Sequence, residues 1–333
     1  MPSRAFSLAT QLVESVGQTP AGSIAWVDVD GPADVPIVQQ WCDATGNTVL
    51  AVHPDAVEIY RGRPSDPVEV LPPERRPGYR LWIYTNFHCN LACDYCCVGS
   101  SPRAEPRIIS RDDFAGLVDE AVNIGVGELY LTGGEPFMLL DLDERLSLAT
   151  AARPTTVLTN GMVWTGERRR RLEALPRDNL TLQISLDSAD AELHDRHRGA
   201  GTHRRAREGI ALALALGFRV RVAATLGADA GDEERRLNQL FDELGLDGDQ
   251  RVIRRVARQG AANAGLVLAR SSLVPEVCVS AEGVWWHPVA AIDPAMRVAD
   301  HWSPLSDTVA TIVDEFRSHR LRGDVLASTF PCA

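Results

Sequence analysis

From residue 81 onward, short apolar runs alternate with longer amphipathic segments along the chain. The runs have the composition of buried strands, and the segments between them repeat apolar residues at helical spacing. Strands are predicted in this way over residues 81–84, 128–132, 155–159, 180–186, 219–226 and 251–256. Helices are predicted between them over residues 114–122, 142–151, 166–175, 203–216 and 233–244. This alternation predicts an α/β fold with a parallel sheet, a partial (β/α)6 TIM-like barrel whose active site lies at the C-terminal ends of the strands.

A small N-terminal α/β domain is predicted before the barrel. Within residues 1–70, the pattern predicts helices over 6–16 and 34–45 and strands over 24–29, 48–53 and 57–61. Residues 71–80 contain three prolines and a glycine, which continue neither a helix nor a strand, so a linker is predicted there. The barrel is then expected over 81–260, followed by a C-terminal extension over 261–333 with a helix at 305–322.

Charge and composition exclude several functions. The formal net charge of −11 argues against nucleic acid as the main partner. All 34 basic residues are arginine, which excludes Schiff-base chemistry on lysine, a pyridoxal phosphate anchor and a Walker-type phosphate loop. No apolar run approaches the length of a membrane span, and the N-terminus lacks the pattern of a secretory signal. We therefore expect a cytoplasmic protein without a membrane partner.

Three of the seven cysteines lie close together in one predicted loop. Cys89, Cys93 and Cys96, called the motif cysteines below, follow the first barrel strand at x3 and x2 spacing. An odd number of cysteines with this spacing does not indicate a disulfide framework, whereas grouped thiolates indicate a soft metal centre. Two alternatives are open from the residues alone. One is a zinc or redox site completed by His88 or Cys97, and the other is a [4Fe–4S] cluster with three protein ligands and one open iron.

The spacing of the motif cysteines, with the aromatic Tyr95 just before the last one, resembles the signature of the radical S-adenosylmethionine (SAM) family. A second motif, Gly133-Gly134-Glu135-Pro136, follows the second predicted strand and resembles the glutamate motif of that family. The resemblance implies that the motif cysteines bind a [4Fe–4S] cluster. It also implies that Glu135, with the backbone of the two glycines, holds the amino group of SAM.

Other positions resemble the family less specifically. Ser185 and Asp187, at the end of the fourth predicted strand, look like the positions that contact the ribose and carboxylate of SAM, and a polar strand end is the alternative. Arg198 resembles an arginine near the SAM carboxylate, and the capping of a loop is its alternative. At least one of the arginines at residues 254–258 is a candidate to point into the barrel toward an acidic substrate group.

The C-terminal extension resembles a degenerate SPASM or twitch extension. Cys278 and Gly283 match its opening, but Pro288 stands where a second cysteine is usual, and Cys332 matches the start of the final cysteine pair. Two thiolates are too few for the usual cysteine-ligated cluster, so a second cluster is not expected. Cys278 and Cys332 are instead candidate hydrogen-atom donors.

The N-terminal domain resembles the small fold of TusA-type sulfur carriers over residues 24–60. Those carriers hold sulfur on a cysteine followed by proline at the start of the first helix, where this chain reads PSRAF at residues 2–6. Cys42 lies on the apolar side of the second predicted helix and is expected to be buried. We therefore expect this domain to dock a partner rather than to carry sulfur.

The family resemblance implies an enzyme that cleaves SAM reductively to methionine and a 5′-deoxyadenosyl radical, which abstracts hydrogen from a substrate inside the barrel. An external electron donor of the flavodoxin or ferredoxin type is an expected partner. Members with this layout often modify ribosomal peptides, so a peptide substrate is expected. A small natural product or a sulfur-related intermediate is the alternative. A non-catalytic iron–sulfur scaffold is a third alternative, opposed by the intact motif cysteines and Glu135.

Overall fold

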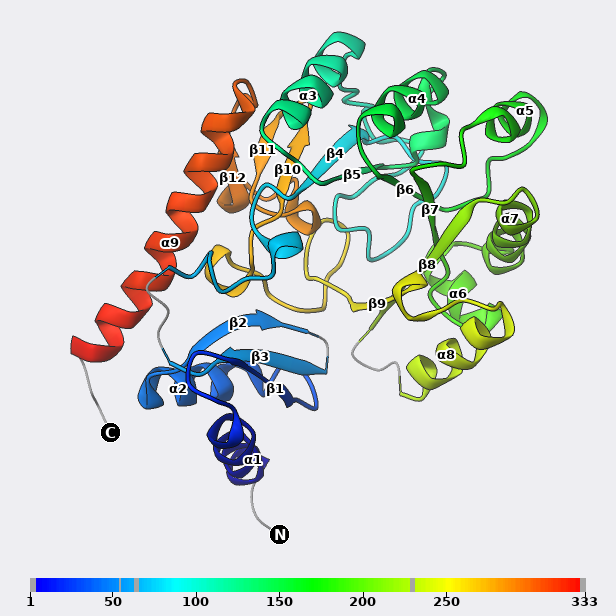
Figure 1. The fold of residues 1–333 in the computed structure, drawn as a ribbon. Helices are drawn as coiled ribbons and strands as arrows, with labels where there is room; N and C mark the ends of the chain where they lie inside the picture. The colour runs from blue at the N-terminus through cyan, green and yellow to red at the C-terminus, as the bar shows by residue number, and fades with distance from the viewer. Residues whose placement is uncertain (1–3, 54, 63–65, 228–230, 330–333) are drawn as a thin grey trace. The chain divides into compact units, whose positions relative to one another are not determined.

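The computed structural model describes residues 4–53, 55–62, 66–227 and 231–329 (Figure 1). The chain divides into two compact units. Unit 1 comprises Met1–Pro77, Leu268–Pro275 and Ala310–Ala333, and unit 2 comprises Gly78–Val267 and Glu276–Val309. These units differ from the segments expected from the sequence, because residues 261–333 contribute to both. The functional division into those segments stays a prediction.

Unit 1 contains a three-stranded antiparallel sheet with strand order β1-β3-β2. Its elements lie where the hydrophobic pattern predicts them: α1 Arg4–Gln18, β1 Ile24–Asp28, α2 Val35–Thr45, β2 Thr48–Val52 and β3 Ala56–Tyr60. Leu8 and Leu12 of α1 recur at helical spacing, and both are fully buried in one core with Val38 of α2. Cys42 is also fully buried in this core, as predicted, and burial raises the pKa of its thiol to about 12. The resemblance to sulfur carriers stays a prediction.

Unit 2 is built on a nine-stranded, mostly parallel sheet. Six parallel strands lie side by side in chain order: β4 Arg80–Asn86, β5 Glu128–Gly133, β6 Thr155–Thr159, β7 Leu180–Ser185, β8 Arg219–Leu226 and β9 Arg251–Arg255. The predicted helices follow the strands: α3 Arg111–Asn123, α4 Leu142–Ala152, α5 Gly166–Ala174, α7 Thr202–Ala215 and α8 Glu233–Glu243. Figure 1 shows these helices along the outer side of an open arc of strands. The predicted α/β class and parallel sheet are confirmed.

The strand register separates the two faces of this sheet. Residues paired across neighbouring strands point to the same face. One such row is entirely apolar and fully buried: Leu131, Val157, Leu182 and Val220. The adjacent row, on the opposite face, is largely polar: Tyr130, Thr156, Thr181 and Arg219. The helices therefore cover the apolar face, and the polar face, called the inner face below, is the face of the barrel interior.

Four elements of unit 2 are absent from the sequence prediction. β10 Val277–Ser280 lies parallel to β4, and β11 Gly283–Trp285 and β12 Arg297–Ala299 continue the sheet antiparallel. The helix α6 Ala191–Arg198 lies between β7 and α7. The last helix, α9 Leu305–Thr329, begins in unit 2 and continues in unit 1. The predicted helix at 305–322 is thus present, and its unit 1 portion carries an ion pair from Arg317 to Asp66 at 2.6 Å.

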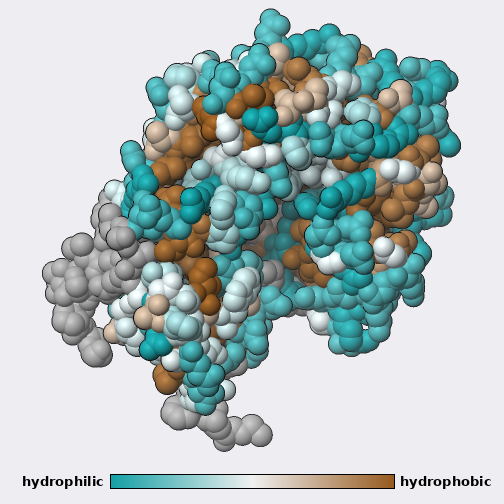
Figure 2. Space-filling model, in the orientation of Figure 1, coloured by the Kyte–Doolittle hydropathy of each residue, from teal (hydrophilic) through white to brown (hydrophobic). Residues whose placement is uncertain are grey.

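The surface mixes apolar and polar side chains, as Figure 2 shows for one face. A groove between α4 and α5 is lined by apolar residues, including Phe137, Leu140 and Leu172, with Arg168 and Arg171 among its charged residues. Within the described ranges, none of the helices combines the length and hydropathy that crossing a membrane requires.

Two helical glycines provide a test of the packing in the two units. A Cβ on Gly209 of α7 would lie 2.3 Å from the carbonyl oxygen of Gly161, whereas a Cβ on Gly17 of α1 would meet nothing within 4 Å. We expect Gly209→Ala to lower the free energy of unfolding by about 1–3 kcal/mol through overpacking. Gly17→Ala should raise it by up to about 1 kcal/mol, because alanine favours a helix. Urea unfolding followed by circular dichroism measures both, and changes of the same sign would contradict this packing.

Candidate functional site

The motif cysteines lie in the loop after β4, at the C-terminal edge of the parallel strands. Cys89 is buried, and Cys93 and Cys96 are half-buried. Their thiols are close enough for mutual electrostatic interaction. The backbone N–H of Leu91 points to Sγ of Cys89 at 3.4 Å, and that of Ser100 points to Sγ of Cys96 at 3.3 Å. Such hydrogen bonds to sulfur are a feature of iron–sulfur ligation.

The protonation of these thiols bears on metal binding. Burial raises the pKa of Cys89 to about 12 and that of Cys93 to about 11, so both are protonated at neutral pH and a metal centre must displace their protons. In the part of the chain that the structure describes, no three His, Cys, Asp or Glu side chains are arranged to hold a single metal ion. In a cluster, each cysteine binds a different iron, so the three sulfurs need not converge on one point. The donor set fits a cluster with three protein ligands.

His88 and Cys97, the residues that could complete a zinc site, lie in different surroundings. Cys97, like Cys96, packs against an apolar cluster that contains Tyr84, Phe87 and Cys278, and it interacts electrostatically with Cys96. Burial raises the pKa of Cys97 to about 11. The backbone of His88 forms a bridge to Ser101 on the far side of the loop.

The Gly133-Gly134-Glu135-Pro136 segment is bound directly to the chain that enters the cysteine loop. The N–H of Gly134 donates to the carbonyl of Asn86 at 3.0 Å, and that of Glu135 donates to the carbonyl of His88 at 2.9 Å. A Cβ on Gly133 would lie 2.2 Å from the Asn86 oxygen, and one on Gly134 would lie 2.1 Å from the His88 oxygen. The glycines thus allow two backbones to meet, whereas the sequence suggested close approach to a ligand.

Glu135 is fully buried and accepts three hydrogen bonds from uncharged donors. Its Oε1 accepts from the N–H of Phe137 at 3.1 Å and the hydroxyl of Thr159 at 2.8 Å, and its Oε2 accepts from the N–H of Asn160 at 2.8 Å. Burial raises the pKa of Glu135 to about 7. A carboxylate offers about four acceptor positions, so one on Oε2 is left for an ammonium group.

Thr159 and Asn160, at the end of β6, connect Glu135 to the cysteine loop. Besides the bonds to Glu135, the side-chain N–H of Asn160 donates to Oδ1 of Asn90 in the cysteine loop at 2.8 Å. Only the position of Thr-Asn-Gly at a strand end, on the same rim as both motifs, signalled this role.

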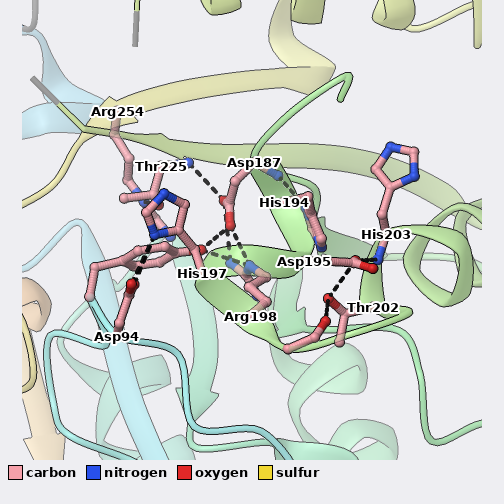
Figure 3. Close-up of polar contacts among 12 residues, drawn as sticks. Asp94, Asp187, His194, Asp195, His197, Arg198, Thr202, His203, Thr225 and Arg254 are labelled. Atoms are coloured by element: carbon pink, nitrogen blue, oxygen red, sulfur yellow. Dashed lines mark hydrogen bonds and ion pairs between the residues drawn. The ribbon is translucent and has the colours of Figure 1, made fainter. Parts of the chain in front are cut away.

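Asp187 and Arg198, which lie side by side in Figure 3, form a largely buried polar cluster with Tyr95. The Tyr95 hydroxyl donates to Asp187, and Nε of Arg198 donates to the Tyr95 oxygen at 2.8 Å. Arg198 and Asp187 form an ion pair in which the two side chains are 8% and 4% exposed. Burial opposes the ionisation of Asp187, yet the charge and hydrogen bonds of Arg198, with the bond from Tyr95, hold the pKa of Asp187 below its usual range.

The end of α6 also binds the cysteine loop next to Tyr95. The N–H of Asp94 donates to the carbonyl of His197 at 3.2 Å, and Nδ1 of His197 lies 2.9 Å from Oδ2 of Asp94. We call Asp94, Tyr95, Asp187, His197 and Arg198 the α6 clamp. It joins the cysteine loop to the end of β7 and brings together three of the residues singled out in the sequence.

The remaining predicted residues are placed as follows. Ser185 ends β7, is half-buried and pairs in register with Ala223 on β8. Pro136 is buried in the short turn after Glu135. The contacts of Ser185, Asp187 and Arg198 with SAM stay predictions.

The candidate hydrogen-atom donors are not both visible. Cys278 is fully buried on β10, packed with Tyr84, Phe87 and Trp285, and burial raises the pKa of its thiol well above the usual range. Cys332 lies outside the described residues. Their role as donors stays a prediction.

Comparison with known proteins shows what the domain resembles. Residues 83–242 match the family model of the Radical SAM superfamily. The GTP 3′,8-cyclase of Synechococcus sp. (strain CC9902) is 29% identical over 248 residues, which cover 72% of this chain and 67% of the cyclase. The mycofactocin maturase MftC of Mycolicibacterium smegmatis is 37% identical over 122 residues, which cover 36% of this chain and 30% of the maturase.

A third relative and a solved structure extend the comparison. The AdoMet-dependent heme synthase of Methanosarcina barkeri is 32% identical over 159 residues, which cover 47% of this chain and 45% of the synthase. The chain thus spans less than half the length of this synthase and of the maturase. The structure of anSMEcpe with bound AdoMet shares the fold over 72% of this chain and 83% of that chain, with a TM-score of 0.56 and 15% identity.

The α6 clamp predicts a strong coupling between its two buried charges. We expect Arg198→Met to lower the free energy of unfolding by about 3–5 kcal/mol, because it leaves the Asp187 carboxylate buried without its cation. The double variant Arg198→Met/Asp187→Asn should lose less than the sum of the two single variants. Urea unfolding measures this cycle.

The exposed pair of Arg204 and Glu208 on α7, 2.7 Å apart with 73% and 60% side-chain exposure, is the matched control. Arg204→Met should cost no more than about 1 kcal/mol. Additive losses at Arg198 and Asp187 would show that the buried pair is not coupled.

Proposed function

We propose that this chain, an enzyme with a radical SAM domain at residues 83–242, generates a radical from SAM and uses it to modify a peptide substrate. The observation that carries the proposal is the joining of two sites by backbone hydrogen bonds. Glu135 and the motif cysteines are both attached to the segment 86–88, so a cluster ligated by the cysteines and a molecule held by Glu135 would be neighbours.

The residues fit the cofactors of the family. Radical SAM enzymes use a [4Fe–4S] cluster and SAM, and the motif cysteines supply the three thiolates that such a cluster needs. The open acceptor position of Glu135 suits the amino group of SAM. When bound, the cluster and SAM supply a 5′-deoxyadenosyl radical that abstracts a hydrogen atom from the substrate.

The chain's own residues would orient and isolate this chemistry. The α6 clamp fixes the cysteine loop from the side of β7, and Asn160 links Asn90 of that loop to Glu135. Behind the loop, the apolar cluster of Phe87, Val98 and Trp285 keeps water away from the cysteines. An electron donor of the flavodoxin or ferredoxin type would deliver the single electron.

Two observations support a peptide substrate. One relative is named a mycofactocin maturase, and the structure of anSMEcpe with bound AdoMet and Cp18Cys peptide shares the fold over 72% of this chain, at 13% identity and a TM-score of 0.55. We also propose that the N-terminal helices and sheet of unit 1 dock the substrate or a partner. Their cysteine, Cys42, is fully buried and so unsuited to carrying sulfur.

A small-molecule substrate is the second candidate. It is favoured by the similarity to GTP 3′,8-cyclase, which extends over 248 residues and is longer than that to the maturase. The two candidates differ in what accelerates SAM cleavage. A rise in 5′-deoxyadenosine formation on addition of GTP would favour the small molecule, whereas a rise on addition of a precursor peptide would favour the peptide.

The first prediction tests the radical function itself. Anaerobically reconstituted protein should bind about four irons and, with dithionite, convert SAM to 5′-deoxyadenosine. Alanine at any of the three motif cysteines should abolish the product and most of the iron. Cys97→Ala is the matched control within the same loop and should keep both, since Cys97 lies outside the Cys-x3-Cys-x2-Cys motif. A protein that holds four irons but forms no 5′-deoxyadenosine would contradict the proposal.

A second prediction concerns pH. Binding of the SAM ammonium requires ionised Glu135, whose pKa is raised to about 7 by burial. The affinity for SAM should therefore be highest between about pH 7 and 8. It should fall as the pH drops toward about 6, where Glu135 becomes protonated, and fall again above about pH 8, where the α-amino group loses its proton. Glu135→Gln should bind SAM more weakly and without the fall at low pH. Calorimetry on the reconstituted protein measures it, with the exposed Glu167→Gln as control, and a flat profile for the unsubstituted protein would remove Glu135 from the SAM site.

A further inference from the structure

Arg254 stands at the C-terminal rim of the barrel, on the inner face of the last parallel strand. It pairs in register with Thr225 of β8, which lies on the same face as Arg219 because alternate residues of a strand share a face. Its side chain is exposed, and its Nε donates to the Thr225 hydroxyl at 3.2 Å. In Figure 3, Arg254 and Thr225 lie beside Asp187.

Two other arginines near this rim have carboxylate partners. Arg198 pairs with Asp187, and Arg255, next to Arg254 in the chain, lies 3.5 Å from Glu234. Among the described residues, the bond to the Thr225 hydroxyl is the contact recorded for the Arg254 side chain, and no carboxylate lies within ion-pair distance of it. Acidic residues outnumber basic residues in this chain, which has a formal net charge of −11. A shortage of carboxylates therefore does not explain why Arg254 has no acidic partner in the described structure.

The segment after Arg254 is fastened to the cysteine loop. The N–H of Ala261 donates to the carbonyl of Cys96 at 2.9 Å, and a Cβ on Gly260 would lie 2.3 Å from the same oxygen. The charge of Arg254 acts electrostatically on Cys97, the residue after the last motif cysteine, and on His287. The guanidinium is therefore held on the side of the barrel mouth that adjoins the cysteine loop.

We propose that Arg254 binds a carboxylate of the substrate, and thereby selects acidic substrates and places them beside the cysteine loop. This inference rests on the proposed function and names the chemistry of its substrate. Because Nε is engaged by Thr225, the two terminal nitrogens are left to face two oxygens in one plane, which is the geometry of a carboxylate. In the free protein the exposed guanidinium of Arg254 stays hydrated, so its charge pays little desolvation cost there. Binding of the substrate carboxylate then removes water from the new ion pair.

The test uses a pair of probes that differ in one charge. N-acetyl-L-glutamic acid α-amide carries the carboxylate of an acidic peptide side chain, and N-acetyl-L-glutamine amide is its neutral isostere. Binding of each to full-length, anaerobically reconstituted, SAM-loaded protein at low salt is measured by ligand-observed NMR. We expect the acidic probe to bind at least about tenfold more tightly than the neutral one.

Variants assign the effect to Arg254. Arg254→Gln should remove the preference for the acidic probe, and Arg254→Lys should keep part of it, because an ammonium lacks the bidentate fork. Arg204→Gln, at an exposed arginine on α7, should leave it unchanged. Equal binding of the two probes, or an unchanged preference in Arg254→Gln, would overturn the proposal. Tighter binding of inorganic phosphate than of the acidic probe would overturn the carboxylate assignment.

Two further readouts separate this inference from the proposed function. Arg254→Gln should bind SAM as the unsubstituted protein does and should form 5′-deoxyadenosine without substrate at the same rate. A loss of SAM affinity would place Arg254 in the SAM site and overturn its role in substrate binding. If no 5′-deoxyadenosine forms in any variant while the acidic probe still requires Arg254, the radical function fails and the carboxylate site stands.

Discussion

The hydrogen bonds between segment 86–88 and the glycine motif are the constraint on which the rest of the site depends. They are backbone bonds, so no side-chain rotation can release them, and the two glycines allow them because any Cβ would collide with a carbonyl oxygen. The side chain of Asn86 adds a bond to the carbonyl of Glu135 at 3.2 Å. The cysteine loop and a buried carboxylate, which follow two neighbouring strands, are thereby held together by the backbone.

Two buried carboxylates at the same rim show how surroundings set different roles. Asp187 has a guanidinium and a phenol as partners, and its pKa is lowered, so it is a permanent anion that holds the loop. Glu135 has only neutral donors, and burial raises its pKa to about 7, so its charge is incompletely compensated. A fixed, compensated charge serves architecture, whereas an uncompensated one is available to a cationic ligand.

The parts of this fold that the sequence predicts are those with a strong local period. The six β/α repeats and both motifs follow from apolar runs, helical spacing and cysteine spacing, because each is encoded within a few neighbouring residues. β10 was missed because it is four residues long and because its parallel partner, β4, is separated from it in the sequence by the other five strands of the barrel. α6 was missed because only two of its eight residues, Ala191 and Leu193, are apolar aliphatic residues, although Asp190 caps it by accepting from two backbone N–H groups. The bonds from Thr159 and Asn160 to Glu135 could not be predicted for a related reason: a Thr-Asn-Gly turn has the same local pattern whether or not a carboxylate lies beside it.

The pairing of β10 with β4 has a consequence for the order in which the protein is made. β4 leads into the motif cysteines near the start of the barrel, yet one of its two neighbouring strands is formed by residues 277–279. The carbonyl of Cys96 likewise accepts a hydrogen bond from the N–H of Ala261, far along the chain. During synthesis, the cysteine loop leaves the ribosome long before either of these segments. A nascent chain therefore exposes its three thiols beside an unfinished sheet, and the site proposed for the cluster is complete only after the late segments have arrived.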